Sequence, residues 1–573
     1  MTVVSQQGRK NIENFRLSAL TKAATTSHAC AITLLVVVSL LAFLPGFFQI
    51  PPVDRDEARF AQATKQMIES GDYVDIRFQD EARYKKPVGI YWLQAAVVQA
   101  AEVVGVPRAR LRIALYRIPS LVGAIGAVIL TYWAALAFVS RRASFLAALM
   151  MATSILLGVE ARIATTDAML LLTVIAVFGA MARAYLAVQG ERVTKIDPLV
   201  IAAIFWSAIG AGILLKGPLI LGIVGLAALA LTIIDRSAGW LTRLRPALGT
   251  AWALALVLPW FIAIFIRSDG DFFTEAIADD MLSKVTGGQE THGMPPGYYL
   301  VLFWVTFFPG AMLAGAAVPA IWRSRSEPGC RFLLSWIVPT WILFELVPTK
   351  LPHYVLPLYP AVAILIAGIV DGHALSRDRR LSGGPIAWFI LMVALALVSI
   401  ALPVALGQGL RLIAWPFAAA AVIFGLFAWS LFGVDGAETS LLRAAAGTIM
   451  FFFAAYGVTL PAMRTLFPSV SLANYVRAAN CPNPEVVSAG FAEPSLVFLA
   501  GTNVNFGSGL TAADFLNGEP CRFAFIDSRQ ERSFVQRADA IGLRYAPGPR
   551  VEGFNINSGQ FITIAIYRSE TAP

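Results

Sequence analysis

The densest group of side chains able to do chemistry is the run 54–59, Asp-Arg-Asp-Glu-Ala-Arg, which follows a long apolar segment. A carboxylate can accept a proton from an attacking group, and a guanidinium can stabilise an anion that leaves. The same residues can also cap a helix, because Asp and Glu near a helix N-terminus accept backbone N–H bonds. The run alone therefore leaves a catalytic and a structural role open.

A basic and aromatic segment follows in the same polar stretch. Residues 83–87 read Arg-Tyr-Lys-Lys-Pro, and Tyr91 and Trp92 come directly after them. Cations beside aromatic rings at a membrane boundary are suited to binding a lipid-linked anion. We therefore expect the two segments to contribute to one site.

Three further polar clusters interrupt apolar runs. They are 162–167, Lys216 before Gly217-Pro218, and 349–354. Ionisable residues in such settings are costly unless they are used. The loop 268–297 adds more carboxylates and a histidine. The residues that we expect to line one outer site are Tyr84, Lys85, Arg162, Asp167, Lys216, His292, His353 and Tyr354.

The elements that must position these residues are membrane-spanning helices. Of 573 residues, 57% are hydrophobic and 14% are charged, whereas a soluble domain is roughly one quarter charged. Apolar runs long enough to cross a bilayer recur through 30–463. We count 13 candidate spans, near 31–48, 113–138, 144–159, 166–188, 198–215, 217–234, 247–266, 298–321, 332–347, 354–371, 386–407, 411–433 and 443–461.

The distribution of Lys and Arg predicts the orientation. The formal charge of +9 gathers in short segments at alternate loops, which the positive-inside rule explains better than nucleic-acid binding does. Residues 1–29 are then cytoplasmic, while 51–112 and the C-terminal segment lie outside. The first apolar run lacks a small-residue cleavage site and is predicted to be an anchor.

The two outer segments have different predicted structures. In 51–112, Phe60, Ala63, Met67 and Ile68 recur at helical spacing, which predicts a helix on the membrane surface, and 88–104 is interfacial. In 464–573, apolar runs of strand length at 485–489, 522–526 and 561–567 and a helical stretch at 532–541 predict a small α/β domain. Cys481 and Cys521 lie in it, and their spacing leaves a disulfide open.

Several of these segments resemble a known family. Residues 56–60, 70–74 and 83–92 resemble, in order and spacing, the first outer loop of aminoarabinose transferases and related protein mannosyltransferase-like enzymes (glycosyltransferase family 39/83 type). Segments 216–218 and 350–360 resemble two further motifs, so the match runs from about residue 30 to 365. The resemblance implies a GT-C fold of 13 transmembrane helices with two juxtamembrane helices, a periplasmic C-terminal domain and a polyprenyl-phosphate sugar donor.

The resemblance also implies roles for individual residues. The family's acidic catalytic pair corresponds to Asp56 and Glu57, of which Asp56 is the stronger candidate, and its phosphate-contacting lysine corresponds to Lys86. In our hypothesis, Asp56 takes the proton of an attacking hydroxyl or amine as a polyprenyl phosphate leaves the anomeric carbon. The cations expected to stabilise the leaving phosphate are Lys86, Arg59, Arg83 and Lys350.

The sequence departs from the aminoarabinose subgroup at two points. It has Lys85 where that subgroup has Glu, and Asp279-Asp280 where the subgroup has Glu-His. We associate those positions with a metal in the subgroup, so the departures argue against a zinc site of the same kind and against assuming that the sugar is aminoarabinose. No motif demands a cofactor, and a divalent metal ion, if one is used, would be held by Asp279 and Asp280. His292 is more typical of a structural histidine than of a ligand.

The predicted function is transfer of a sugar from undecaprenyl phosphate to an envelope acceptor, lipid A or lipopolysaccharide core, by a monomer at the outer face of the inner membrane. The sugar remains open; Lys85 is compatible with a carboxylate-bearing donor such as galacturonic acid. The alternative is a lipid-linked sugar transporter or flippase. That function would need charges near the bilayer midplane, whereas these gather at the outer ends of the spans.

Overall fold

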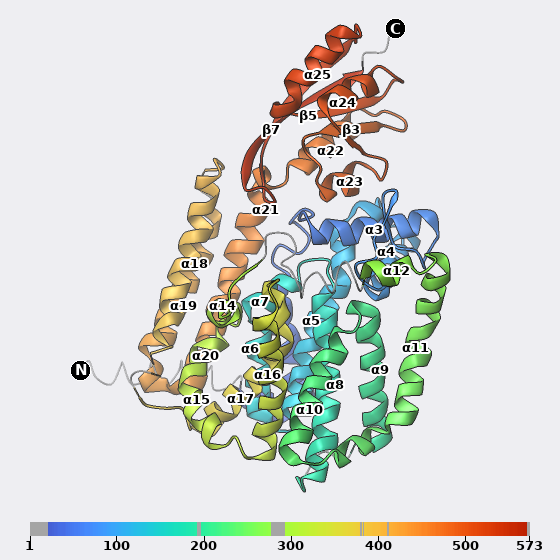
Figure 1. The fold of residues 1–573 in the computed structure, drawn as a ribbon. Helices are drawn as coiled ribbons and strands as arrows, with labels where there is room; N and C mark the ends of the chain where they lie inside the picture. Colours follow the sequence, from blue (N-terminus) through green and yellow to red (C-terminus); the bar gives the residue numbers. More distant parts are fainter. Residues whose placement is uncertain are drawn as a thin grey trace, which may run out of the picture.

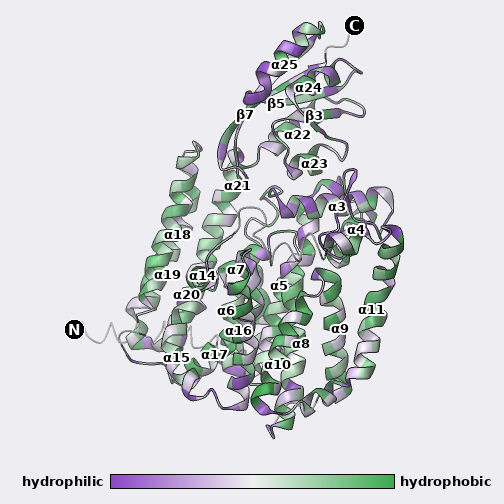
Figure 2. Ribbon diagram, viewed as in Figure 1, coloured by the Kyte–Doolittle hydropathy of each residue, from purple (hydrophilic) through white to green (hydrophobic). Residues whose placement is uncertain are grey.

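Long apolar helices make up most of the chain, and a small mixed sheet lies beyond one end of them (Figure 1). The computed structural model describes residues 21–191, 196–276, 293–378, 381, 383–409 and 412–569. Hydrophobic residues cover the bundle helices, while hydrophilic residues are frequent on helix α3 and on the C-terminal domain (Figure 2). The predicted class, an α-helical polytopic membrane protein with a C-terminal α/β domain, is confirmed.

Nine helical segments in the described ranges are long and apolar enough to cross a membrane. A helix pair bent by 111°, α14 (Tyr298–Thr306) with η4 and α15 (Gly310–Arg323), makes a tenth if it counts as one span. The nine are α5 (Ile113–Ala135), α8 (Asp167–Val188), α9 (Pro198–Lys216), α11 (Pro246–Arg267), α16 (Pro328–Leu346), η5 with α17 (Pro352–Asp371), α18 (Ile386–Ala405), η6 with α19 (Leu412–Ser430), and α20 with its extension (Phe432–Ala462).

The predicted number of 13 spans is not confirmed. Each predicted segment contains helix, but α2 (His28–Phe43) and α10 (Leu219–Asp235) are shorter apolar helices. The predicted span 144–159 is divided, because α6 (Arg141–Ala152) ends before Thr153, and α7 (Ile155–Glu160) begins anew. The Ser154 hydroxyl caps α7 by accepting the N–H of Leu157, which satisfies an otherwise unpaired donor.

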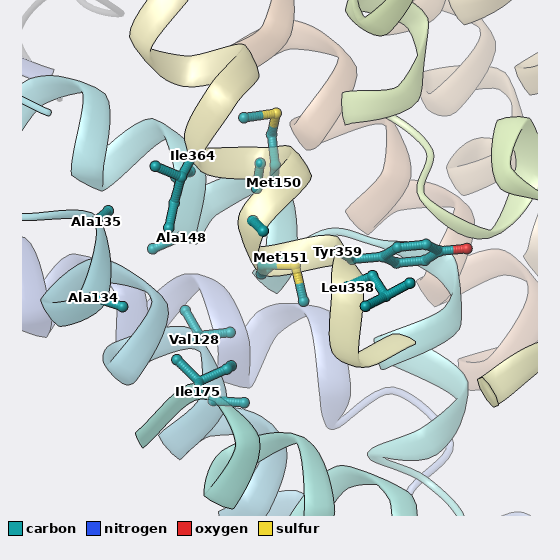
Figure 3. Close-up of a cluster of buried hydrophobic side chains, with 14 of the residues drawn as sticks. Val128, Ala134, Ala135, Ala148, Met150, Met151, Ile175, Leu358, Tyr359 and Ile364 are labelled. Atoms are coloured by element: carbon teal, nitrogen blue, oxygen red, sulfur yellow. The ribbon is translucent and has the colours of Figure 1, made fainter. Parts of the chain in front are cut away.

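The core of the bundle lies between α5, α6, α8 and α17. Figure 3 shows small residues of α5 and α6, such as Ala135 and Ala148, beside larger ones such as Val128, Ile175 and Ile364. Small side chains let helix backbones approach closely, which strengthens packing where lipid provides no hydrophobic driving force. This packing fixes the ends of α7, α8 and η5 nearest the C-terminal domain, termed the outer ends, where polar residues follow.

Two helices lie across the outer ends of the bundle (Figure 1). They are α3 (Asp56–Ser70) and α4 (Gly89–Val103), joined by a segment that contains the short hairpin of β1 (Arg77–Phe78) and β2 (Glu81–Ala82). The predicted helix is present, and α3 buries Phe60, Ala63, Met67 and Ile68, the residues that recur at helical spacing. The Thr64 hydroxyl donates to Gln94 Oε1 at 2.6 Å and links the two helices.

The C-terminal domain is built on a five-stranded sheet in the order β4-β3-β5-β7-β6. Strand β3 pairs in parallel with β4 and β5, and β7 is antiparallel to β5 and β6. The strands predicted at 485–489, 522–526 and 561–567 and the helix predicted at 532–541 are confirmed. The elements are α22 (Pro468–Ala478), β3 (Glu485–Ala489), α23 (Pro494–Ala500), β4 (Asn505–Gly507), α24 (Gly509–Leu516), β5 (Arg522–Asp527), α25 (Ser528–Ala540), β6 (Tyr545–Asn555) and β7 (Gln560–Ser569).

A disulfide joins Cys481 to Cys521, which answers the question that spacing had left open. It ties the segment before β3 to the residue before β5, and these two strands are neighbours in the sheet. The domain rests on α3 through α23 (Figure 1).

Candidate active site

A cavity of about 300 Å³ opens at the outer ends of the bundle helices. It gathers residues from the start of α3, the segment before α4, the turn between α7 and α8, the end of α9, and η5. Five polar clusters far apart in the sequence therefore meet at one place. The lining residues are Val53, Asp54, Arg55, Asp56, Glu57, Phe60, Arg83, Lys85, Lys86, Glu160, Ile163, Thr165, Thr166, Asp167, Lys216, Leu351, His353 and Tyr354.

Asp56 is the carboxylate most open to this cavity. It is the first residue of α3 and is exposed. The preceding residue, Arg55, has φ 70° and ψ −117°, a backbone conformation that residues other than glycine seldom adopt. The sharp turn at Arg55 starts the helix and leaves the Asp56 side chain at the cavity. The partial positive charge of the helix N-terminus favours a carboxylate there.

Glu57 has a different environment, although it is the next residue. Its Oε1 accepts from Arg117 Nε at 2.7 Å and from the Ala164 N–H at 2.9 Å, and its Oε2 accepts from Arg117 Nη2 and the Val53 N–H, both at 2.8 Å. A carboxylate has about four acceptor positions. All four are filled by the chain, which favours a structural role for Glu57 over the predicted catalytic one.

Asp167, Lys216 and His353, which belong to three separate clusters in the sequence, come together at the lining. Lys216 Nζ lies 2.5 Å from Asp167 Oδ1, and His353 Nε2 lies 3.8 Å from the same oxygen. Lys216 Nζ also lies 5.6 Å from the centre of the Tyr354 ring. Asp167 is the first residue of α8, so its position depends on where that helix begins.

Glu160 is a lining residue that the sequence analysis missed. Its Oε1 lies 3.7 Å from His353 Nδ1, and its Oε2 accepts the Thr165 hydroxyl at 3.0 Å. His353 is thus placed between two carboxylates, those of Glu160 and Asp167. The missed signal was an acidic residue at the end of an apolar run, a setting in which charges are rarely idle.

Cations form another part of the lining. Lys85 is exposed, Lys86 is half-buried and Arg83 is buried. The guanidinium carbon of Arg83 lies over the Phe60 ring, 5.1 Å from its centre. The Nε of Arg83 has no hydrogen-bond partner within the described part of the chain. A buried donor without an acceptor is costly. An anion bound in the cavity would satisfy it.

Four predicted site residues are absent from the described lining of the cavity: Arg59, Tyr84, Arg162 and Lys350. Arg162 donates to the carbonyls of Pro45, Ala42 and Gly158. Its guanidinium carbon lies 4.4 Å from the centre of the Tyr456 ring.

Lys350 Nζ donates to the Val347 carbonyl at 2.6 Å, and the Tyr84 hydroxyl donates to Asp75 Oδ1 at 2.9 Å. Burial and Asp75 raise the pKa of Tyr84 to about 12. These bonds occupy the polar groups of Arg162, Lys350 and Tyr84, and the structure does not bring the three residues into the described lining.

No protein-family model matches the chain. An undecaprenyl phosphate-α-4-amino-4-deoxy-L-arabinose arabinosyl transferase of Yersinia pestis (strain Pestoides F) is 29% identical over 392 residues, which are 66% of each chain. The transferase of the same name from Erwinia tasmaniensis is 29% identical over 315 residues, 54% of each. These matches span about two thirds of the relatives' length or less.

Solved structures extend the likeness to nearly the whole chain. ArnT from Cupriavidus metallidurans in the apo state superposes with a TM-score of 0.72 at 20% identity, over 94% of this chain and 98% of that one. The same protein bound to undecaprenyl phosphate gives 0.71 at 19% identity, over 93% and 97%. This chain has the GT-C fold. The resemblance drawn from the motifs is thereby confirmed.

The GT-C fold does not by itself settle the predicted metal residues. Asp279, Asp280 and His292 lie outside the described residues, so their prediction stays a prediction. Within the described ranges, no group of three His, Cys, Asp or Glu side chains could hold a metal ion.

Proposed function

We propose that this chain transfers a sugar from undecaprenyl phosphate to lipid A or lipopolysaccharide core at the periplasmic face of the inner membrane. The observation that carries the proposal is the cavity, in which the exposed carboxylate of Asp56 shares a lining with Arg83, Lys85 and Lys86. The names of the relatives and the undecaprenyl phosphate bound to the structurally similar ArnT support the donor.

The cationic lining suits the donor phosphate. Arg83 is held by Phe60 and the packing around it, and its unpartnered Nε can donate to a phosphate oxygen. Lys86 adds a second positive charge. Charge-assisted hydrogen bonds in a partly dehydrated cavity are stronger than in water, and they strengthen further as the leaving phosphate gains charge.

Asp56 is placed to accept the proton that the acceptor loses. The acceptor oxygen attacks the anomeric carbon, and a new C–O bond forms as the bond from that carbon to the phosphate oxygen breaks. The proton moves to the Asp56 carboxylate, and undecaprenyl phosphate leaves with the bonding electron pair. A well-placed base contributes about 10²- to 10⁴-fold to such a step.

Asp167, Glu160 and His353 are proposed to bind the sugar. Sugar hydroxyls are donors and acceptors, and a buried carboxylate gives strong, oriented acceptance. Lys216 fixes the Asp167 carboxylate by its contact of 2.5 Å, so the acceptor oxygens present a defined geometry. Which sugar fits this geometry is left to the experiment below.

The orientation of the chain in the membrane is also part of the proposal. The positive-inside pattern predicts a periplasmic C-terminal domain. The Cys481–Cys521 disulfide supports this side, because disulfides persist in oxidising compartments such as the periplasm. We propose that the chain acts as a monomer, since the described residues of one chain supply every group that the mechanism uses.

Mass spectrometry of lipid A, core and other envelope glycans tests the function. Cells would carry wild-type protein, Asp56→Ala, no protein, or the matched control Glu81→Gln, which changes an exposed carboxylate of the same outer segment. We expect one sugar on lipid A or core with wild type and control only. Unchanged glycans in all four strains, with lipid-linked sugar accumulating on one membrane face, would support the flippase.

A further inference from the structure

The C-terminal domain inserts one side chain into the helices that carry the site. Phe498 of α23 is fully buried in a cluster formed by α3, α4 and α5. Its ring lies 5.3 Å from that of Tyr116, and its carbonyl accepts from Lys65 Nζ at 3.2 Å. The domain is therefore docked on α3.

Hydrogen bonds between the domain and the outer segment fall into two groups. One group lies toward the C-terminal end of α3, where Thr502 donates to Glu69 Oε2 at 2.8 Å and its carbonyl accepts from Gln79 Nε2 at 3.0 Å. The other lies just before the helix. There, the Ser495 N–H donates to Asp54 Oδ1 at 2.9 Å.

Arg55 belongs to the second group. Its Nε donates to Asn557 Oδ1 at 2.5 Å, and Asn557 is in the turn between β6 and β7. Asp54 and Arg55 are thus both held by the C-terminal domain, and they are the two residues before Asp56. A residue at φ 70° costs about 1 to 3 kcal/mol and persists only where its surroundings determine it.

A single carboxylate organises this second group. Glu493 accepts from Asn555 Nδ2 at 2.8 Å and from Asn557 Nδ2, which turns the Asn557 amide oxygen toward Arg55. Glu493 is also the residue that precedes α23, so it lies two positions before the Ser495 N–H that binds Asp54. The β6–β7 turn and the start of α23 therefore both bind the segment 54–56, through Arg55 and Asp54 respectively.

We propose that the C-terminal domain positions the catalytic aspartate, with Asn557 and Glu493 as positioning residues that act through Arg55 and Asp54. This inference rests on the proposed function of Asp56. It assigns the domain a task inside the reaction, since the conformation that delivers Asp56 to the cavity is held by hydrogen bonds from outside the membrane bundle.

The test compares two variants of the full-length protein in lipid nanodiscs. Asn557→Ala removes the bond to Arg55, and Thr502→Val removes hydroxyl bonds at the other end of the same interface. With undecaprenyl-phosphate aminoarabinose as donor and lipid A as acceptor, we expect Asn557→Ala to lower kcat about 10- to 100-fold at unchanged donor KM, because misplacing a reacting group costs that much. Thr502→Val should keep the wild-type kcat.

Hydrogen–deuterium exchange of the peptide 51–60 gives a readout that needs no turnover. We expect faster exchange in Asn557→Ala than in wild type, and wild-type exchange in Thr502→Val. Equal exchange and equal kcat in both variants would overturn the proposal. If the wild type transfers no sugar from this or any other donor, the proposed function fails, while the exchange comparison still decides whether the domain positions the segment.

A second variant covers the case in which Asn557→Ala does not fold. Arg55→Met removes the guanidinium but leaves the Asn557–Glu493 contact in place. It should show the same faster exchange of 51–60 with unchanged exchange in α23. Uniformly faster exchange across α3 and α23 would instead indicate loss of docking and would contradict a local positioning role.

Discussion

Two groups of charged residues lie at the end of the helix bundle that carries the cavity, and they differ in their burial and in what they face. The frame group, Glu57, Arg117 and Arg162, is buried and bonded to the chain. The lining group, Asp56, Arg83, Lys85 and Lys86, faces the cavity, and Arg83 Nε lacks a partner among the described residues.

The difference teaches how to separate structural from functional charges at one site. A buried charge is tolerated only with its hydrogen bonds filled. Arg117 fills two of the four acceptor positions of Glu57, and backbone N–H groups fill the other two. Asp56 and Glu57 are neighbours in the sequence, but successive helical side chains point about 100° apart. One therefore faces the cavity and the other faces Arg117. The predictions below test whether the two groups fail in different ways.

The largest expected effect is that of Asp56→Asn on turnover. The amide keeps the size of the side chain but cannot accept the proton, so kcat should fall by about 10²- to 10⁴-fold. Donor binding and the thermal midpoint should stay at their wild-type values, because Asp56 is exposed and supports no packing. Turnover at the wild-type rate in this variant would remove Asp56 from the mechanism.

Glu57→Gln should show the reverse behaviour. It leaves the Arg117 guanidinium buried beside a neutral group, which costs about 3 to 5 kcal/mol when a buried pair is broken. Thermal unfolding of the purified protein should show a clearly lowered midpoint, whereas the matched Asp56→Asn should not. An unchanged midpoint with abolished turnover would return Glu57 to the catalytic group.

Lys86→Met is expected to act on donor affinity. Losing a charge-assisted hydrogen bond costs about 1.5 to 3 kcal/mol, which weakens donor binding by about 10- to 100-fold. The matched control is Arg77→Gln, an exposed cation of the same outer segment that is absent from the described lining. Binding of undecaprenyl phosphate by isothermal titration calorimetry would reveal the difference. Equal losses in both variants would indicate general surface electrostatics instead.

The smallest expected effect is a pH dependence through Asp54. Burial and Glu493 raise the pKa of Asp54 to about 6, against the hydrogen bond from Ser495 and the charge of Arg59. The carboxylate accepts the Ser495 N–H more strongly than the acid does, so kcat should rise with pH through about 6. Asp54→Asn should flatten this part of the profile, and an unaltered inflection would contradict the assignment.

The stability that Asp54 contributes depends on pH in the opposite direction to kcat. Between the ordinary Asp value of 3.8 and about 6, the folded protein holds a proton on Asp54 that the unfolded chain has released. The stability that this group contributes therefore falls as pH rises through that window. Chemical unfolding at several pH values should show a shallower decline for Asp54→Asn than for wild type.

Part of this site could be predicted from the sequence. Asp56, Lys86, Asp167, Lys216 and His353 were found because each is a polar residue in an apolar setting or in a motif of recognisable spacing, and all five line the cavity. The surface helix α3 followed from its apolar spacing, and the strands of the C-terminal domain followed from short apolar runs.

The rest depended on partners that are distant in the sequence. Glu57 looked catalytic because Arg117, which donates hydrogen bonds to its carboxylate, is 60 positions away in the sequence. Arg162 and Lys350 looked available because backbone carbonyls, which bind them, leave no sequence signal. Glu160 was missed at the end of an apolar helix. The docking of Phe498 between outer helices could not be read from an apolar residue in a small domain.

One measurement tests the central claim most directly. The purified chain would be reconstituted in liposomes with lipid A and the undecaprenyl-phosphate-linked sugar that mass spectrometry identifies, and free undecaprenyl phosphate and glycosylated lipid A would be quantified together. The account predicts that the two products appear one for one with wild type and that neither appears with Asp56→Asn. Movement of the intact lipid-linked sugar between leaflets, with no release of undecaprenyl phosphate, would contradict it.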